Sequence, residues 1–224
     1  MSRYRLRNAL EDALQVSSRL PTIWRIWHEE TLDPHLREEI MVAVAAAVGC
    51  PYCTFSHREM ILQSGESLVA LADFEQVDVE PRYFAAIIWA QAKVEASFGV
   101  APTAIESSLR STFTPEECHE IETVAIAMWL MSSCGHQADN LVERLKGSPE
   151  KGSSLGNELL MAAIYFPPAL AVYFALAARR GSIRSLADDF RAFSENFQDQ
   201  RRSGDGRMQF NESESMGSQI QPVA

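Results

Sequence analysis

Apolar residues recur at spacings of three and four along most of the chain, without the strict apolar–polar alternation of half-buried strands. This pattern predicts an all-α helical bundle. Pro21 separates a first amphipathic helix from the segment that follows, and Asp33-Pro34 caps and opens a long helix. Gly49-Cys50-Pro51 breaks that helix and starts the next, which we expect to end near Gln63.

The second half of the chain also contains residues that mark the starts and ends of helices. Residues 64–80 are expected to be mostly loop, and Pro81 opens a helix that continues to about Ser97. Thr114 and Glu117 have the spacing of a capping box, in which each side chain accepts the free backbone amide of the other. Another long helix therefore starts at this point.

A faint internal repeat runs through this pattern. Glu38 precedes Cys50 by the same number of residues as Glu122 precedes Cys134, and an apolar helical stretch lies between the two residues in both cases. Both copies also begin with a turn and a proline-led helix. We therefore predict a core built from a duplicated helix hairpin.

Every residue from Leu159 to Ala178 is uncharged, and most are apolar. Two adjacent prolines, Pro167-Pro168, interrupt this run, so we expect one helix to end near Tyr165 and a second helix to begin at the prolines. Each helix would then be too short to span a bilayer. A buried helix pair or an oligomer interface is the favoured interpretation, and membrane association is the alternative.

Net charge and cysteine content exclude some classes of function. The formal net charge of −10 and the pI near 5.0 argue against a nucleic-acid partner, which requires a clustered positive surface. Four cysteines are too few for a secreted disulfide framework, and residues 1–20 lack the pattern of a secretory signal. We therefore expect a cytoplasmic protein.

The sequence Cys50-Pro-Tyr-Cys53-Thr-Phe-Ser-His57 carries the most specific chemistry. With Pro51 as the first helical residue, Cys50 is the N-cap, and Cys53 and His57 follow on the same face. The positive end of the helix favours a thiolate, which places the more acidic and more exposed thiol at Cys50. A second thiol three residues away can close a disulfide, so the motif predicts a reversible redox dithiol.

Glu38 lies on the preceding helix, about one turn or ~6 Å from the level of His57, and is therefore expected to orient the imidazole. Two alternatives stay open. The cysteines can be small buried hydrophobes, or they can bind zinc together with His57, with Cys134 and His136 as the spare source of a fourth ligand.

The arrangement of Glu38, Cys50-x-x-Cys53 and His57 resembles the carboxymuconolactone decarboxylase-like superfamily, and more closely its alkyl-hydroperoxidase D-like (AhpD-like) branch. The resemblance covers about residues 32–146. It implies an all-α fold, a homo-oligomer (trimer or hexamer), and a peroxiredoxin-type antioxidant activity that reduces hydroperoxides or disulfides without a metal, flavin or other cofactor. A thiol reductant protein would be the partner that regenerates the dithiol.

By position, the resemblance assigns peroxide attack to Cys53, resolution to Cys50, and proton relay to Glu38 and His57. The helix-capping argument instead favours Cys50 for exchange with an external dithiol, so the order of attack stays open. Many family members carry a histidine where this chain has Tyr52, which weakens the expectation of strong peroxidase activity. The decarboxylase branch lacks the two cysteines.

We therefore expect four parts. Residues 1–31 form N-terminal helices packed on the core, residues 32–146 form the AhpD-like domain, residues 147–200 form C-terminal helices, and residues 201–224 form a disordered tail. The leading hypothesis is a thiol-dependent oxidoreductase using Cys50, Cys53, His57 and Glu38. The alternatives are a redox-sensing or zinc-clip interaction protein and a decarboxylase-type enzyme.

Overall fold

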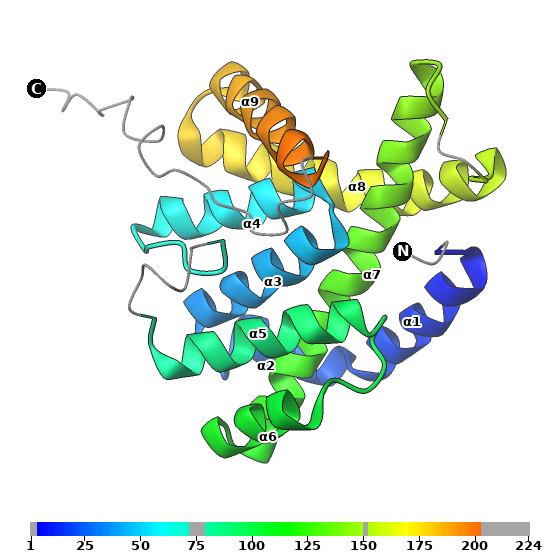
Figure 1. Cartoon of the computed structure of the whole chain (residues 1–224). Coiled ribbons are helices and arrows are strands. Elements are labelled where there is room, and N and C mark those ends of the chain that lie inside the picture. Colours follow the sequence, from blue (N-terminus) through cyan, green and yellow to red (C-terminus); the bar gives the residue numbers. More distant parts are fainter. Residues whose placement is uncertain (1–3, 72–78, 150–151, 203–224) are drawn as a thin grey trace, which may run out of the picture.

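The computed structural model describes residues 4–71, 79–149 and 152–202, which form nine helices and no strand (Figure 1). The predicted all-α class is confirmed. The predicted disordered tail lies outside these residues from 203 onward, whereas Arg201 and Arg202 belong to the last helix.

The first two helices are α1 (Leu6–Ser18) and α2 (Leu20–His28). Pro21 lies in the first turn of α2, where its missing amide costs no helical hydrogen bond, so it marks the predicted boundary. Both helices pack against α7.

The next pair, α3 (Pro34–Val48) and α4 (Pro51–Ser64), forms the predicted helix hairpin. The Asp33 carboxylate caps α3 by accepting the amide of His35. Gly49 ends α3 with a φ of 89°, a left-handed conformation that glycine adopts without a Cβ clash. The chain then turns directly into α4, which packs back against α3.

Three helices follow, α5 (Pro81–Glu95), α6 (Thr103–Thr112) and α7 (Pro115–Leu145). Thr114 and Glu117 form the predicted capping box at the start of α7. The predicted second hairpin is wrong, because α7 continues through Cys134 and Gly135 as one helix. The apolar residues around Cys134 are buried against other helices, and no left-handed residue interrupts the backbone there.

The last two helices are α8 (Leu155–Arg180) and α9 (Ile183–Arg202). The predicted helix break at Pro167-Pro168 is wrong, because α8 passes through both prolines. The prolines leave the carbonyls of Ala163 and Ile164 without helical donors, but all four residues are exposed, so water can satisfy those carbonyls. The opposite face of α8 packs on α4, α7 and α9 and keeps the helix continuous.

Because α8 is continuous through Pro167-Pro168, the expectation that each of two helices is too short to span a membrane no longer holds. By length and composition α8 could cross a bilayer, and 22% of its most apolar stretch is buried in the protein. A single helix of this kind is weak evidence for a span. The cytoplasmic location and the absence of a membrane partner stay predictions.

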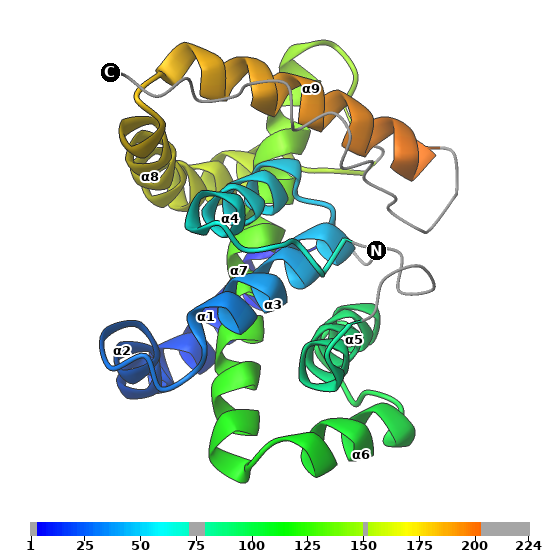
Figure 2. The ribbon, with the colours of Figure 1, turned by 90° about the vertical axis from the view of Figure 1, so that its left-hand side faces the viewer.

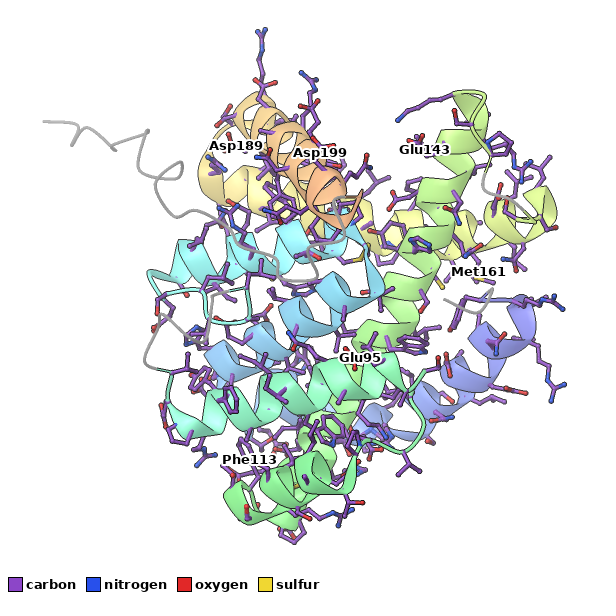
Figure 3. All side chains as sticks on the ribbon, viewed as in Figure 1. Glu95, Phe113, Glu143, Met161, Asp189 and Asp199 are labelled. Atoms are coloured by element: carbon purple, nitrogen blue, oxygen red, sulfur yellow. A yellow bond between two sulfur atoms is a disulfide. The ribbon has the colours of Figure 1, made fainter. Side chains whose placement is uncertain are left out.

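The long helix α7 runs through the molecule beside α3 (Figures 1 and 2). At one end α4, α8 and α9 gather, and at the other end lie α5 and α6 (Figure 2). Side chains fill the spaces between these helices, and Met161 of α8 is among those beside α7 (Figure 3). The start of α4 is therefore enclosed by α7 and α8.

Candidate functional site

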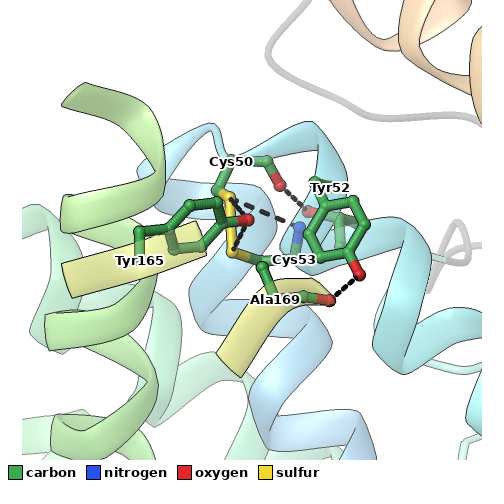
Figure 4. The surroundings of a disulfide bond; sticks show 6 residues. Cys50, Tyr52, Cys53, Tyr165 and Ala169 are labelled. Carbon is green, nitrogen blue, oxygen red and sulfur yellow. Dashed lines mark hydrogen bonds between the residues drawn. A yellow bond between two sulfur atoms is a disulfide. The ribbon is translucent and has the colours of Figure 1, made fainter. Parts of the chain in front are cut away.

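The start of α4 holds both cysteines of the motif. Cys50 has extended backbone angles and is the N-cap, and its Sγ accepts the amide of Cys53 at 3.3 Å. A disulfide joins Cys50 to Cys53, with their Cα atoms 5.4 Å apart (Figure 4). The two sulfurs thus lie at the positive end of the helix, the position that the capping argument predicts.

The two sulfurs are buried. Cys50 is 0% exposed and Cys53 is 5% exposed. The expectation that Cys50 is the more exposed thiol is therefore wrong, because α7 and α8 cover the N-terminus of α4. Of the two cysteines, only Cys53 keeps any contact with solvent.

Tyr165 of α8 is a site residue that the sequence did not reveal. Its hydroxyl lies 3.4 Å from Sγ of Cys53 and 3.6 Å from Sγ of Cys50 (Figure 4). Burial raises the pKa of this phenol well above its ordinary range, and the charge of Asp139 raises it further. The hydroxyl therefore keeps its proton at neutral pH and is available as a hydrogen-bond donor to sulfur.

Gly135 of α7 makes room for this contact. A Cβ at this position would lie 2.7 Å from Sγ of Cys50 and 2.9 Å from two ring atoms of Tyr165. Both distances are shorter than van der Waals contact, so a side chain at residue 135 would push the phenol and the disulfide apart. Close packing of α7, α8 and α4 at the sulfurs thus depends on glycine.

Glu38 and His57 form a second pair. Oε2 of Glu38 lies 2.7 Å from Nδ1 of His57, and Arg37 binds the other carboxylate oxygen at 3.1 Å. Burial by itself raises the pKa of Glu38, but the hydrogen bond and charge of His57, together with Arg37, outweigh it and hold this pKa below its ordinary value. When Nδ1–H donates to the carboxylate, the neutral ring presents Nε2 as a base.

The four residues expected at the site do not all touch one another. Hydrogen bonds join Glu38 to His57 and both sulfurs to Tyr165, and none joins His57 to a sulfur within the ranges that the structure describes. The four residues therefore form two neighbouring groups on α3 and α4. Their catalytic roles stay a prediction.

A cavity of about 620 Å³ borders the sulfur site and lies between α8, α9 and the ends of α4 and α7. Tyr52, between the two cysteines in sequence, reaches into its wall and donates its hydroxyl to the carbonyl of Ala169 at 2.5 Å (Figure 4). Burial raises the pKa of Asp139 on this wall to about 7, and the charge of Glu143 adds to the effect. Its principal lining side chains are Tyr52, Asp139, Tyr165, Phe166, Tyr173 and Phe190.

The remaining cysteines lie apart from this chemistry. Sγ of Cys134 contacts the sulfur of Met161 at 3.6 Å in the core, and burial raises the pKa of its thiol to about 11. Cys118 is half-buried near the start of α7. In the part of the chain that the structure describes, no three His, Cys, Asp or Glu side chains are grouped so that they could hold a metal ion.

Part of the chain matches a known protein family. Residues 20–96 match the Carboxymuconolactone decarboxylase family. No curated protein and no solved structure matches the chain. The matched region begins and ends earlier than the expected 32–146 and contains Glu38, Cys50, Cys53 and His57. It leaves α6 to α9 outside, and with them Gly135 and Tyr165.

Proposed function

We propose that the protein is a thiol-dependent oxidoreductase of the AhpD-like type, in which Cys50 and Cys53 cycle between dithiol and disulfide. The observation that carries this proposal is the disulfide between these residues at the N-terminus of α4, with a protonated phenol against both sulfurs. The match of residues 20–96 to the Carboxymuconolactone decarboxylase family supports it. A thiol reductant protein returns the disulfide to the dithiol.

Reduction of a hydroperoxide takes two steps. The Cys53 thiolate attacks the terminal peroxide oxygen, the O–O bond breaks, and an alcohol leaves with a proton, so Cys53 becomes a sulfenic acid. Cys50 then attacks the Cys53 sulfur and water leaves, which closes the disulfide. The residual exposure of Cys53, against none for Cys50, favours Cys53 as the attacking thiol.

Glu38 and His57 have the role of a proton relay in this proposal. The carboxylate holds Nδ1–H of His57, so Nε2 is the basic nitrogen on the helix that carries Cys53. The low pKa of Glu38 keeps the carboxylate charged across the neutral range. The imidazole thus accepts a thiol proton, through water where it does not reach the sulfur directly.

Single cysteine substitutions test the proposal. Cys53→Ser and Cys50→Ser should each abolish multiple-turnover consumption of hydroperoxide and of a disulfide substrate with a dithiol as reductant. Cys118→Ser is the matched control, because this half-buried thiol lies outside the site, and it should retain wild-type turnover. Full turnover by Cys53→Ser would overturn the proposal.

Lactone decarboxylation is the second candidate, because the matched family carries that description. It makes no use of the redox dithiol. Wild-type protein and a Cys50→Ser/Cys53→Ser double variant should be assayed with a carboxymuconolactone. Equal decarboxylation by both proteins would support this second function over the first.

We also propose that the chain self-associates through α8. Leu159 is 51% exposed, Leu160 is 40% exposed and Ile164 is 45% exposed, a large apolar surface for a protein to leave in water. Light scattering after size-exclusion chromatography should give a multiple of the chain mass, which Leu159→Lys lowers. Val100→Lys is the control, because Val100 is an exposed apolar residue in the loop between α5 and α6. A monomeric wild type would contradict the proposal.

A further inference from the structure

The cavity beside the disulfide shares a wall with the sulfur site. Tyr165 lines the cavity, and its hydroxyl contacts both sulfurs. Tyr52 lines the same cavity from the first turn of α4. Since Cys50 is 0% exposed and Cys53 is 5% exposed, a small molecule needs an adjoining space in which to reach the dithiol. Among the residues described, this cavity adjoins the sulfurs through Tyr165, although neither cysteine lines it.

The chemistry of the wall restricts what can bind. On α9, Ala187, Phe190 and Ser194 face the cavity at spacings of three and four, so one side of that helix lines it. Aromatic rings from α4 and α8 form the opposite wall. A volume of about 620 Å³ lies within the usual range of small-molecule sites, which are mainly apolar with a few polar groups.

The charges on the wall are of both signs. Lys146 and Arg191 are cationic, Glu195 is anionic, and Asp139, with a pKa of about 7, is ionised in part near neutral pH. A site for a strongly anionic or cationic molecule would instead carry an excess of the opposite charge. The cavity therefore suits a molecule with an uncharged, apolar body.

We propose that this cavity binds an uncharged disulfide with an apolar body as the substrate of the Cys50–Cys53 dithiol. Tyr165 contacts both the bound substrate and the sulfurs in this proposal. The inference rests on the proposed function and names its substrate class. It assigns a role to α8 and α9, which lie outside the region that matches the family.

The reaction transfers two electrons from protein to substrate. The Cys53 thiolate attacks one substrate sulfur, the substrate S–S bond breaks, and the first product thiol leaves with the proton that Cys53 lost. Cys50 then attacks the second sulfur atom of the mixed disulfide, that of Cys53, and the second product leaves as a thiolate. The proton that Cys50 loses passes to this thiolate, while the Tyr165 hydroxyl keeps its own proton and donates a hydrogen bond to sulfur, so one protein disulfide and two product thiols result.

The test fills the cavity from α9. Ala187→Trp places an indole ring in the cavity. Ser194→Phe places a phenyl ring there about two helical turns further along α9, and it serves as the second variant if the first folds poorly. Ala192→Trp is the matched control, because Ala192 is an exposed alanine on the same helix outside the lining. Far-ultraviolet circular dichroism and thermal unfolding show whether each variant keeps the fold.

The reduced proteins are assayed with dibenzyl disulfide and with the small polar hydroxyethyl disulfide. The wild type should have a kcat/KM about tenfold higher for dibenzyl disulfide, and the cavity-filling variants should lose about tenfold on it alone. Ala192→Trp should match the wild type on both substrates. An equal loss on both substrates, or no loss in a folded cavity-filling variant, would overturn the inference.

A binding measurement separates this inference from the proposed function. Dibenzyl sulfide has the same apolar body but no S–S bond, so calorimetry reports its binding whether or not the dithiol reacts. Binding to the wild type that is lost in Ala187→Trp supports the cavity even where turnover fails. No binding to the wild type overturns the inference, as does a change of molar mass in Ala187→Trp, which would make the cavity a contact between two copies of the chain.

Discussion

The hydroxyl of Tyr165 lies 3.4 Å from Sγ of Cys53, although 112 residues separate the two in sequence. This contact brings the C-terminal helix α8 to a motif on α4 and places a protonated phenol against a sulfur that must gain and lose charge during thiol chemistry. Hydrogen bonds to a thiolate stabilise it, so the contact has a measurable effect on reactivity.

Removing the hydroxyl should make the dithiol less reactive. In Tyr165→Phe we expect the pKa of the reactive thiol to rise and the rate of disulfide exchange at neutral pH to fall about tenfold, the effect of losing one charge-assisted hydrogen bond. Stopped-flow exchange across a pH series measures both. Tyr83→Phe is the control, because the Tyr83 hydroxyl donates to the Asp33 carboxylate and Tyr83 does not line the cavity. Identical pH–rate profiles for Tyr165→Phe and wild type would contradict the role given to Tyr165.

A side chain at Gly135 should disturb the same contact. Gly135→Ala places its Cβ against Sγ of Cys50 and the ring of Tyr165, so we expect a loss of about 1–3 kcal/mol in the free energy of unfolding. Urea denaturation monitored by circular dichroism provides the measurement. Gly156→Ala in α8 meets no atom within 4 Å and should be neutral or slightly stabilising. A Gly135→Ala protein as stable as Gly156→Ala would refute the packing argument.

The Glu38–His57 pair should contribute stability that depends on pH. The pKa of Glu38 is lowered in the folded protein, so its contribution is complete above the unfolded value of about 4.3 and is lost as pH falls through the folded value. Glu38→Gln should therefore cost about 1–3 kcal/mol at pH 7 and progressively less in acid. Urea denaturation at several pH values tests this. Glu122→Gln is the control, because Glu122 occupies the matching position before Cys134 and pairs with Arg19 instead of a histidine, in a half-buried ion pair. A cost that is independent of pH would contradict the assignment.

Asp139 should make stability depend on pH in the direction opposite to Glu38. Burial raises its pKa to about 7, so between about pH 4 and pH 7 the folded protein holds a proton that the unfolded chain has released. Stability then falls as pH rises through this window. Asp139→Asn should remove that slope and raise the free energy of unfolding at pH 8 by about 1–2 kcal/mol, because Asp139 is only half-buried. Asp188→Asn, an exposed substitution on α9, should preserve the slope. The same slope in Asp139→Asn would show that another group causes it.

Local rules predicted much of the backbone. Asp33, the Gly49 break and the Thr114–Glu117 capping box all act within a few residues, so the sequence determines them almost independently of the rest of the fold. The break at Pro167-Pro168 was predicted wrongly for the same reason. The tendency of proline to break a helix is a local effect within that helix, whereas packing of α8 on three other helices keeps it continuous.

Some residues of the candidate site could likewise be predicted from local spacing, and others could not. Cys50, Cys53 and His57 share one helix and could be predicted from spacing, and Glu38 followed from a short hairpin. Tyr165 and Gly135 could not be predicted, because their importance comes from contacts across distant helices. A tyrosine in an apolar run does indicate a need for a buried partner, but the run holds both Tyr165 and Tyr173, and the sequence does not say which of them contacts the sulfurs. The burial of Cys50 was missed for the same reason, since α7 and α8 cover it.

A redox titration with peptide mapping shows whether Cys50 and Cys53 form a reversible redox couple. The full-length protein is equilibrated in thiol–disulfide buffers of graded potential, its free thiols are alkylated, and each cysteine is read by mass spectrometry. We predict one reversible two-electron transition in which Cys50 and Cys53 convert together between dithiol and disulfide, while Cys118 and Cys134 remain thiols. Cys50 and Cys53 that stay reduced, or stay oxidised, at every potential in the series would contradict the proposed redox cycle.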